Sequence, residues 1–115
     1  MIEITIYKFL KSKLSAPVYT EVQKDPPKKM VVIEKTGGSE KNHIPRSTFA
    51  IQSYGASLQE AAELNEAVKD AMMDGMTGLI ALNEIVSVNL NSDYNYTDTT
   101  TKKYRYQAVF DIVHY

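Results

Sequence analysis

The chain has 115 residues, and its 13 lysines and arginines against 14 aspartates and glutamates give a formal net charge of −1. With 43% hydrophobic and 23% charged residues, it has the composition of one globular domain, which excludes a disordered, collagen-like or coiled-coil chain. The absence of cysteine excludes disulfides, thiolate zinc sites and a cysteine nucleophile, and the near-zero charge argues against a dedicated nucleic-acid-binding protein.

The first segment has apolar residues at two spacings. Isoleucines alternate over residues 2–6 as in a strand, but apolar side chains also recur at helical spacing as far as Leu14. Only the helical period accounts for Leu14, so we expect a helix over residues 3–14, ended by Pro17. Because the segment lacks the basic and apolar regions of a signal peptide, and no apolar run approaches the ~20 residues of a membrane helix, we expect a cytoplasmic protein without membrane contact.

Three short strands are expected next, over residues 18–22, 30–34 and 48–54. Pro26 and Pro27 make the first connection an extended segment, because two adjacent prolines cannot lie in a central strand. The second strand is almost entirely apolar, which predicts cover on both of its faces.

A capping box marks the start of the clearest helix, expected over residues 58–74. The Ser57 side chain can accept a hydrogen bond from the Glu60 amide, and the Glu60 carboxylate can reach back. Gly75 is the expected stop. Outside its apolar stripe the helix carries one lysine against five acidic residues, a net of −4. The stripe consists of Ala61, Leu64, Val68, Ala71 and Met72.

Two further strands are expected over residues 85–90 and 103–115. The polar segment between them, residues 91–101, would join them into an antiparallel hairpin. The residues expected to share a face are Val86, Val88 and Leu90 in the first of these strands and Tyr104, Tyr106, Ala108, Phe110 and Ile112 in the second.

The expected element order is therefore α-β-β-β-α-β-β. We expect one domain over residues 1–115 and assign it to the α+β class. Its sheet would be a mainly antiparallel meander of four to five strands, interrupted by a helix. Two flanking helices would cover the apolar face of the sheet.

No residues are arranged in a pattern that predicts catalysis, a cofactor or a metal. His43 and His114 have no partner at a diagnostic spacing, and we expect both to be solvated. The polar segment around Asp93 and Asp98 lacks the spaced ligands of a calcium loop, and the Gly-Gly-Ser run at residues 37–39 lacks a Walker lysine. We therefore expect the protein not to be an enzyme.

Basic residues Lys102, Lys103 and Arg105 alternate with Tyr104 and Tyr106, a composition found in single-strand nucleic-acid-binding surfaces. At the period of a strand, however, the tyrosines and the arginine point to opposite faces, so they do not form one platform. We expect no sequence-specific binding of nucleic acid.

Charge is distributed unevenly between the two expected helices. The first carries Lys8, Lys11 and Lys13, whereas the second is acidic and includes Glu63 and Glu66. Opposite charges on different surfaces of one small domain suit a head-to-tail contact between copies. Methionines at the end of the second helix suit core or interface packing.

Four stretches of the chain resemble a known family. They are residues 31–38 (VVIEKTGG), 47–54 (STFAIQSY), 61–65 (AAELN) and 103–112 (KYRYQAVFDI). With the element order, they resemble the tail terminator, or tail completion, proteins of long-tailed bacteriophages of Gram-positive bacteria.

The resemblance implies a small structural protein that assembles in the host cytoplasm as a ring, typically a hexamer. Such a ring sits on the head-proximal end of the virion tail, stops polymerisation of the tail tube protein and docks the head connector protein. It implies no catalytic residue and no cofactor. The candidate interaction residues are Gly37 and Gly38 in an expected flexible loop over residues 37–44, Asp93, Tyr94 and Tyr96 in the segment 91–101, and Glu63 and Glu66 on the acidic helix.

Three other interpretations remain open. One is another head–tail joining, or neck, protein. The second is a small-ligand enzyme or binding module on an α+β sandwich, which would require His43 or Asp93 in an apolar pocket. The third is a single-strand nucleic-acid-binding protein, which would require a basic groove.

Overall fold

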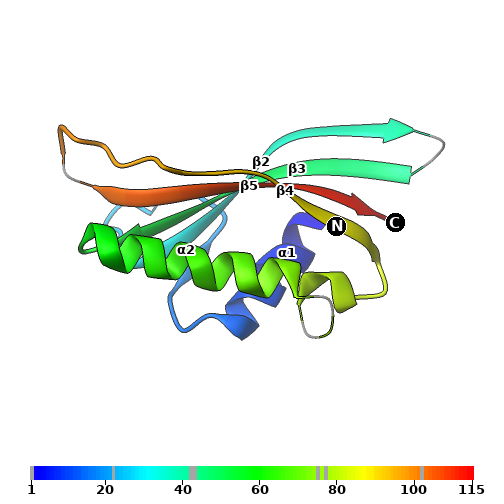
Figure 1. Ribbon diagram of the computed structural model, residues 1–115, viewed down its shortest axis with the longest axis horizontal. Coiled ribbons are helices and arrows are strands. Elements are labelled where there is room, and N and C mark those ends of the chain that lie inside the picture. Colours follow the sequence, from blue (N-terminus) through cyan, green and yellow to red (C-terminus); the bar gives the residue numbers. More distant parts are fainter. Residues whose placement is uncertain (1, 22, 42–43, 75, 77, 102) are drawn as a thin grey trace.

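The structure is a computed structural model that describes residues 2–21, 23–41, 44–74, 76, 78–101 and 103–115. Over these residues the expected order of helices and strands is confirmed, with one additional 3₁₀ turn (Figure 1). The elements are α1 (Ile2–Lys13), β1 (Val18–Tyr19), β2 (Met30–Lys41), β3 (Ile44–Gly55), α2 (Leu58–Met73), η1 (Leu79–Ala81), β4 (Ile85–Asn95) and β5 (Tyr104–His114).

The five strands form one mixed sheet in the order β1-β2-β3-β5-β4. The pairs β2–β3 and β4–β5 are antiparallel, as expected. The pair β3–β5 is also antiparallel, but a meander would place β4 rather than β5 beside β3. The expectation of an antiparallel meander is wrong for β1, which pairs parallel to β2 with Val18 opposite Val31. The connection between them is long enough to return the chain to the same end of the sheet, and a parallel pair requires such a crossover.

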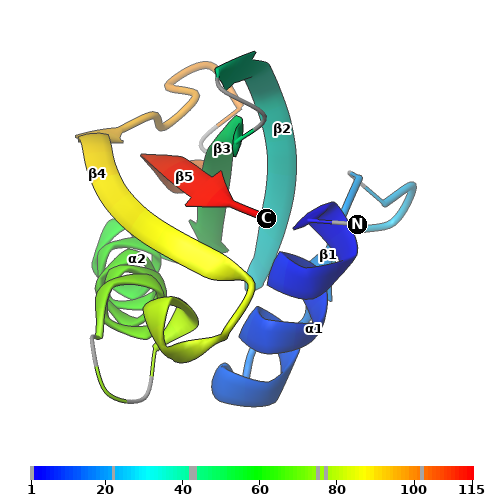
Figure 2. The same ribbon diagram turned by 90° about the vertical axis from the view of Figure 1, so that its right-hand side faces the viewer.

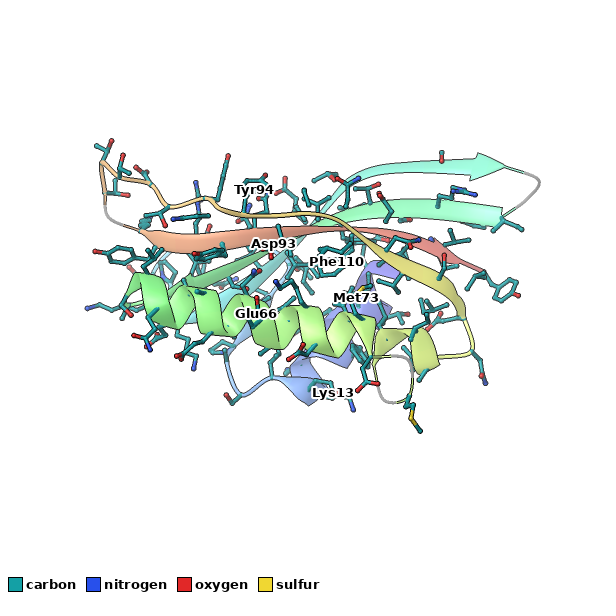
Figure 3. All side chains as sticks on the ribbon, viewed as in Figure 1. Lys13, Glu66, Met73, Asp93, Tyr94 and Phe110 are labelled. Atoms are coloured by element: carbon teal, nitrogen blue, oxygen red, sulfur yellow. The ribbon has the colours of Figure 1, made fainter. Side chains whose placement is uncertain are left out.

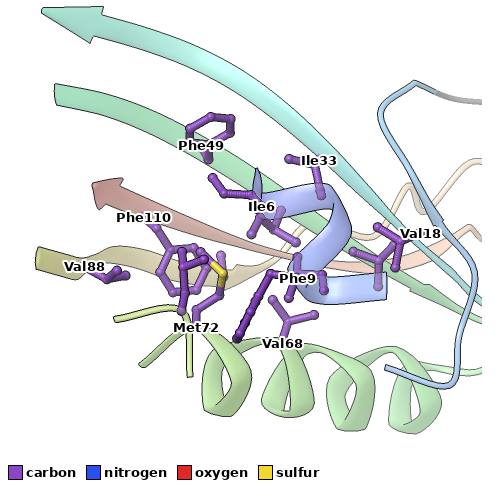
Figure 4. Packing of buried hydrophobic residues seen from close by; sticks show 14 of the residues in the cluster. Ile6, Phe9, Val18, Ile33, Phe49, Val68, Met72, Val88 and Phe110 are labelled. Atoms are coloured by element: carbon purple, nitrogen blue, oxygen red, sulfur yellow. The ribbon is translucent and has the colours of Figure 1, made fainter. Parts of the chain in front are cut away.

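Both helices cover the same face of the sheet, as expected (Figure 2). The core that they enclose contains the two fully buried phenylalanines, Phe49 of β3 and Phe110 of β5 (Figure 4). Four residues of the expected α2 stripe are buried against the sheet, and Ala71 is partly buried beside them. A smaller apolar cluster on the opposite face explains the nearly continuous apolar run of β2, and it consists of Met30, Val32, Tyr54 and the partly buried Tyr19.

The start of α2 is held as the capping box predicts. The Ser57 hydroxyl accepts a hydrogen bond from the Glu60 amide at 3.1 Å. The Glu60 carboxylate reaches back to the amide of Ala56, at 3.2 Å, one residue before the cap. Asp74 is the C-cap residue, and the expected stop at Gly75 lies outside the described residues.

Of the two segments expected to be loops, the described part of residues 37–44 is strand, and residues 91–95 of the segment 91–101 are strand. Gly37 and Gly38 lie in β2 and pair with Thr48 and Ser47 of β3, and β4 continues to Asn95. The polar composition reflects exposure rather than irregular backbone. Only residues 40–41 of β2 and 44–45 of β3 extend past the register of β5 as a two-stranded tip (Figure 1).

The expected face of β4 is partly wrong. A register shift between Ile85 and Ser87 adds a residue to this strand and reverses the alternation that follows it. Ile85 and Val88 are therefore both buried, while Val86 is exposed. Leu90 shares the face of Val88, as expected, but is 40% exposed on this edge strand.

Candidate functional site

A ladder of hydrogen-bonded side chains crosses the face of the sheet that carries no helix. The Tyr54 hydroxyl donates to Oε1 of Gln52, and Nε2 of Gln52 donates to Oε1 of Gln107, each at 3.0 Å. Gln107 in turn donates to the hydroxyl of Tyr94. These bonds join β3, β5 and β4 side by side, so the face is polar, aromatic and ordered.

Arg105 forms a second row on this face. Its guanidinium carbon lies 4.3 Å from the centre of the Tyr96 ring, a cation–π distance. Nε donates to the Tyr96 carbonyl at 2.7 Å, and one terminal nitrogen donates to the Tyr54 hydroxyl at 3.1 Å. Tyr94 meets Tyr96 edge to face, with ring centres 5.7 Å apart. The rings over which Arg105 lies are those of Tyr54 in β3 and of Tyr96, which follows β4, rather than those of its neighbours in β5.

A pocket of about 400 Å³ lies beside Arg105, between the proline-rich connector and the start of β5. We call it the basic pocket, because three of its lining residues are cationic and none is acidic. Among the described residues, no carboxylate lies within 4.0 Å of these cations. The lining residues are Pro26, Pro27, Lys28, Met30, Tyr54, Gly55, Ala56, Lys103, Tyr104 and Arg105.

Asp93 belongs to a network that ties β4 to α2 (Figure 3). Its carboxylate accepts hydrogen bonds from Nδ2 of Asn65 at 2.7 Å and from the Lys69 ammonium at 2.5 Å, and Lys69 also contacts Glu66 at 2.6 Å. The hydrogen bond to Asp93, followed by the one to Glu66, raises the pKa of Lys69 above its ordinary value of 10.5. Two candidate interaction residues, Glu66 and Asp93, are thus paired inside the chain.

Glu63 also has cationic neighbours in its own molecule. It accepts a hydrogen bond from Gln59 at 3.0 Å and lines a surface hollow with Lys13 and Lys29. Part of the acidic surface of α2 therefore lies beside part of the basic surface of α1. The charge asymmetry expected from the sequence is partly compensated within one copy.

The candidate residues thus fall into four places. Glu66 and Asp93 meet through Lys69, and Tyr94 and Tyr96 lie together on the helix-free face. Glu63 lies beside Lys13 and Lys29, and the two glycines lie apart in β2. Arg105 and the glutamine ladder were missed. The hairpin expected from β4 and β5 could have indicated the ladder, because pairing of these two strands places Tyr94 opposite Gln107.

His114 is buried, at 8% exposure, which contradicts the expectation of a solvated histidine. Its Nε2 lies 2.9 Å from the hydroxyl of Ser47, and Nδ1 lies 3.2 Å from the carbonyl oxygen of Tyr115. The cause is the sheet: β5 pairs with β3 as far as Val113 and with β4 as far as His114, and His114 continues its core-facing alternation. The other histidine, His43, lies outside the described residues.

Within the described part of the chain, no group of three or more acidic or histidine side chains could hold a metal ion. The described helices also include none with the length and hydropathy of a membrane span. A scan against models of protein families and a search of curated proteins both found no match to this chain.

Proposed function

We propose that this protein is a phage tail terminator. It forms a ring, with six copies as the typical number, on the head-proximal end of the tail tube. The ring stops the tube protein from polymerising and presents a surface to the head connector protein. This role is structural and requires no catalytic residue and no cofactor.

The observation that best supports the proposal is the position, in the fold, of the four stretches that resemble tail terminators. Its four stretches occupy β2, β3, the first half of α2 and β5. These are the three central strands of the sheet and the helix packed against two of them. The resemblance therefore follows one continuous core rather than scattered surface segments.

The open edge of β2 gives further support to an assembly role. Residues 33–41 of β2 pair with β3 on one side, and no described strand pairs with their other edge. An open strand edge presents unpaired backbone groups and invites pairing with another chain. Contact with a neighbouring subunit or with the tube would pair this edge.

Electron microscopy of particles made without this gene product tests the proposal. Loss of a terminator leaves tube growth unchecked, so we expect tails of excessive and variable length that carry no head. Loss of a different neck protein would instead give tails of normal length without heads. Normal virions would refute both assignments.

Binding of single-stranded nucleic acid is the second candidate, favoured by the stacking of Arg105 on Tyr96 and by the basic pocket beside it. Against it, the stacked faces of Arg105 and Tyr96 already contact each other. A gel-shift titration at two salt concentrations distinguishes the candidates, because backbone binding weakens steeply with salt. We expect no shift with any single-stranded oligonucleotide at physiological salt.

A further inference from the structure

The lining of the basic pocket is complementary to a surface that is both apolar and acidic. Its walls include two prolines, Met30 and two tyrosines, whereas Lys28, Lys103 and Arg105 supply three positive charges. The hydrogen bonds of Arg105 to Tyr96 and Tyr54 fix the orientation of its guanidinium. A volume of about 400 Å³ can take one or two side chains.

A surface with the opposite chemistry lies at the end of α2. Asp70, Met73 and Asp74 stand at i, i+3 and i+4 and so share one side of its last turn, and all three are exposed. Met76 follows with 88% of its surface exposed, and its amide donates to the Asp74 carboxylate. We call these four residues the methionine–acid corner.

Asp70 places a negative charge near the carbonyl end of α2. The carbonyl end of a helix carries a partial negative charge and is stabilised by cations. The last turn of α2 has no basic residue and instead carries Asp70. A cation from another molecule, placed at this end of the helix, would relieve this repulsion. The neighbouring methionines would suit an irregular apolar surface, to which their flexible side chains adapt well.

The two surfaces lie at opposite ends of the same helix (Figure 1). The pocket includes Gly55 and Ala56, which immediately precede the Ser57 cap, whereas the corner follows a helix of 16 residues, about 24 Å long. The positive end of the α2 dipole therefore faces the basic side of the molecule and the negative end faces the acidic side.

We propose that the basic pocket of one copy receives the methionine–acid corner of the next copy. Because the two surfaces do not coincide, the contact is head-to-tail and each copy can bind two neighbours. Repetition of such a contact closes a ring when the rotation between copies allows it. The inference rests on the proposed function and names the contact that the ring would use.

Charge reversal on each side tests the contact. The pocket variant carries Lys28→Glu and Lys103→Glu, and the corner variant carries Asp70→Lys and Met73→Lys. All four side chains are exposed, and lysines at the end of α2 should stabilise the isolated helix, so loss of assembly in the corner variant cannot be ascribed to unfolding. Sedimentation velocity at low salt measures association of the wild type, of each variant and of their equimolar mixture.

We expect the wild type to associate by millimolar concentration and each variant alone to associate at least about tenfold more weakly, or about 1.4 kcal/mol. The mixture should recover association, because the acidic pocket of one variant fits the basic corner of the other in an alternating assembly. A monomeric wild type, unweakened variants or a mixture that stays dissociated would each overturn the proposal.

The matched control reverses two lysines elsewhere, with Lys8→Glu and Lys11→Glu on α1. It should associate like the wild type. If this control weakens association and the pocket variant does not, α1 carries the contact and the present proposal is wrong. Overlong tails in the absence of the gene product would still support the terminator, so the two proposals can fail separately.

Discussion

Truncation of Leu64 to alanine should destabilise the protein by about 3 kcal/mol. Leu64 lies in α2, is 6% exposed and packs in the main core cluster under the sheet. The change removes three carbons, worth about 2.4 kcal/mol at about 0.8 kcal/mol for each buried methylene. Incomplete collapse of the cavity adds to this cost, and measured Leu→Ala losses in cores are about 2–5 kcal/mol.

Urea unfolding monitored by circular dichroism, at protein concentrations low enough to avoid association, measures the change. Leu58→Ala is the matched control, since Leu58 begins the same helix but is 42% exposed. We expect this control to cost less than about 1 kcal/mol. Equal losses for the two variants, or a loss below about 1 kcal/mol at Leu64, would show that α2 does not bury this stripe against the sheet.

Gly55→Ala should destabilise the protein by about 1–3 kcal/mol, because a Cβ at this position would lie 2.5 Å from the amide nitrogen of Ala61. Gly37→Ala is the control, since its Cβ would meet no atom closer than 3.9 Å, and it should change the unfolding free energy by less than about 1 kcal/mol. Similar losses for both glycine variants in urea unfolding would refute this reasoning. A double-mutant cycle with Lys69→Met and Asp93→Asn should give a coupling energy that is full from neutral pH up to 10.5. The coupling should fall as pH rises through the raised pKa of Lys69, because only the ammonium pairs with the carboxylate. Coupling that does not change with pH would contradict the ion pair.

Local patterns in the sequence were sufficient to predict most of the fold. The capping box at Ser57 and the apolar stripe of α2 located that helix to within one residue at its end. Alternation in β5 predicted three of its four buried side chains, Ala108, Phe110 and Ile112, because the strand is regular and lies between two others. Such signals depend on near neighbours alone.

The errors arose where pairing between distant segments decided the structure. Gly37 and Gly38 have poor intrinsic strand propensity, but pairing with β3 extends β2 through them. The bulge between Ile85 and Ser87 changed which residues of β4 face the core, and no local pattern in the sequence predicts it. The parallel placement of β1 likewise depends on how a connector returns across the sheet.

The candidate surfaces were harder to predict for the same reason. The basic pocket joins the connector after β1, the end of β3 and the start of β5, three segments far apart in the sequence. The pairing of Glu66 and Asp93 with Lys69 also requires β4 to lie beside α2. Charge counts along single helices identified acidic and basic segments but not which of them are compensated within the chain.

Negative-stain electron microscopy of growing tail tubes, with and without the purified protein, tests the central claim most directly. If the protein is a terminator, added protein should bind one end of each tube and halt its growth, so tubes become shorter as its concentration rises. Tubes that lengthen at the same rate with the protein present, or protein bound along their sides rather than at an end, would contradict the proposed function.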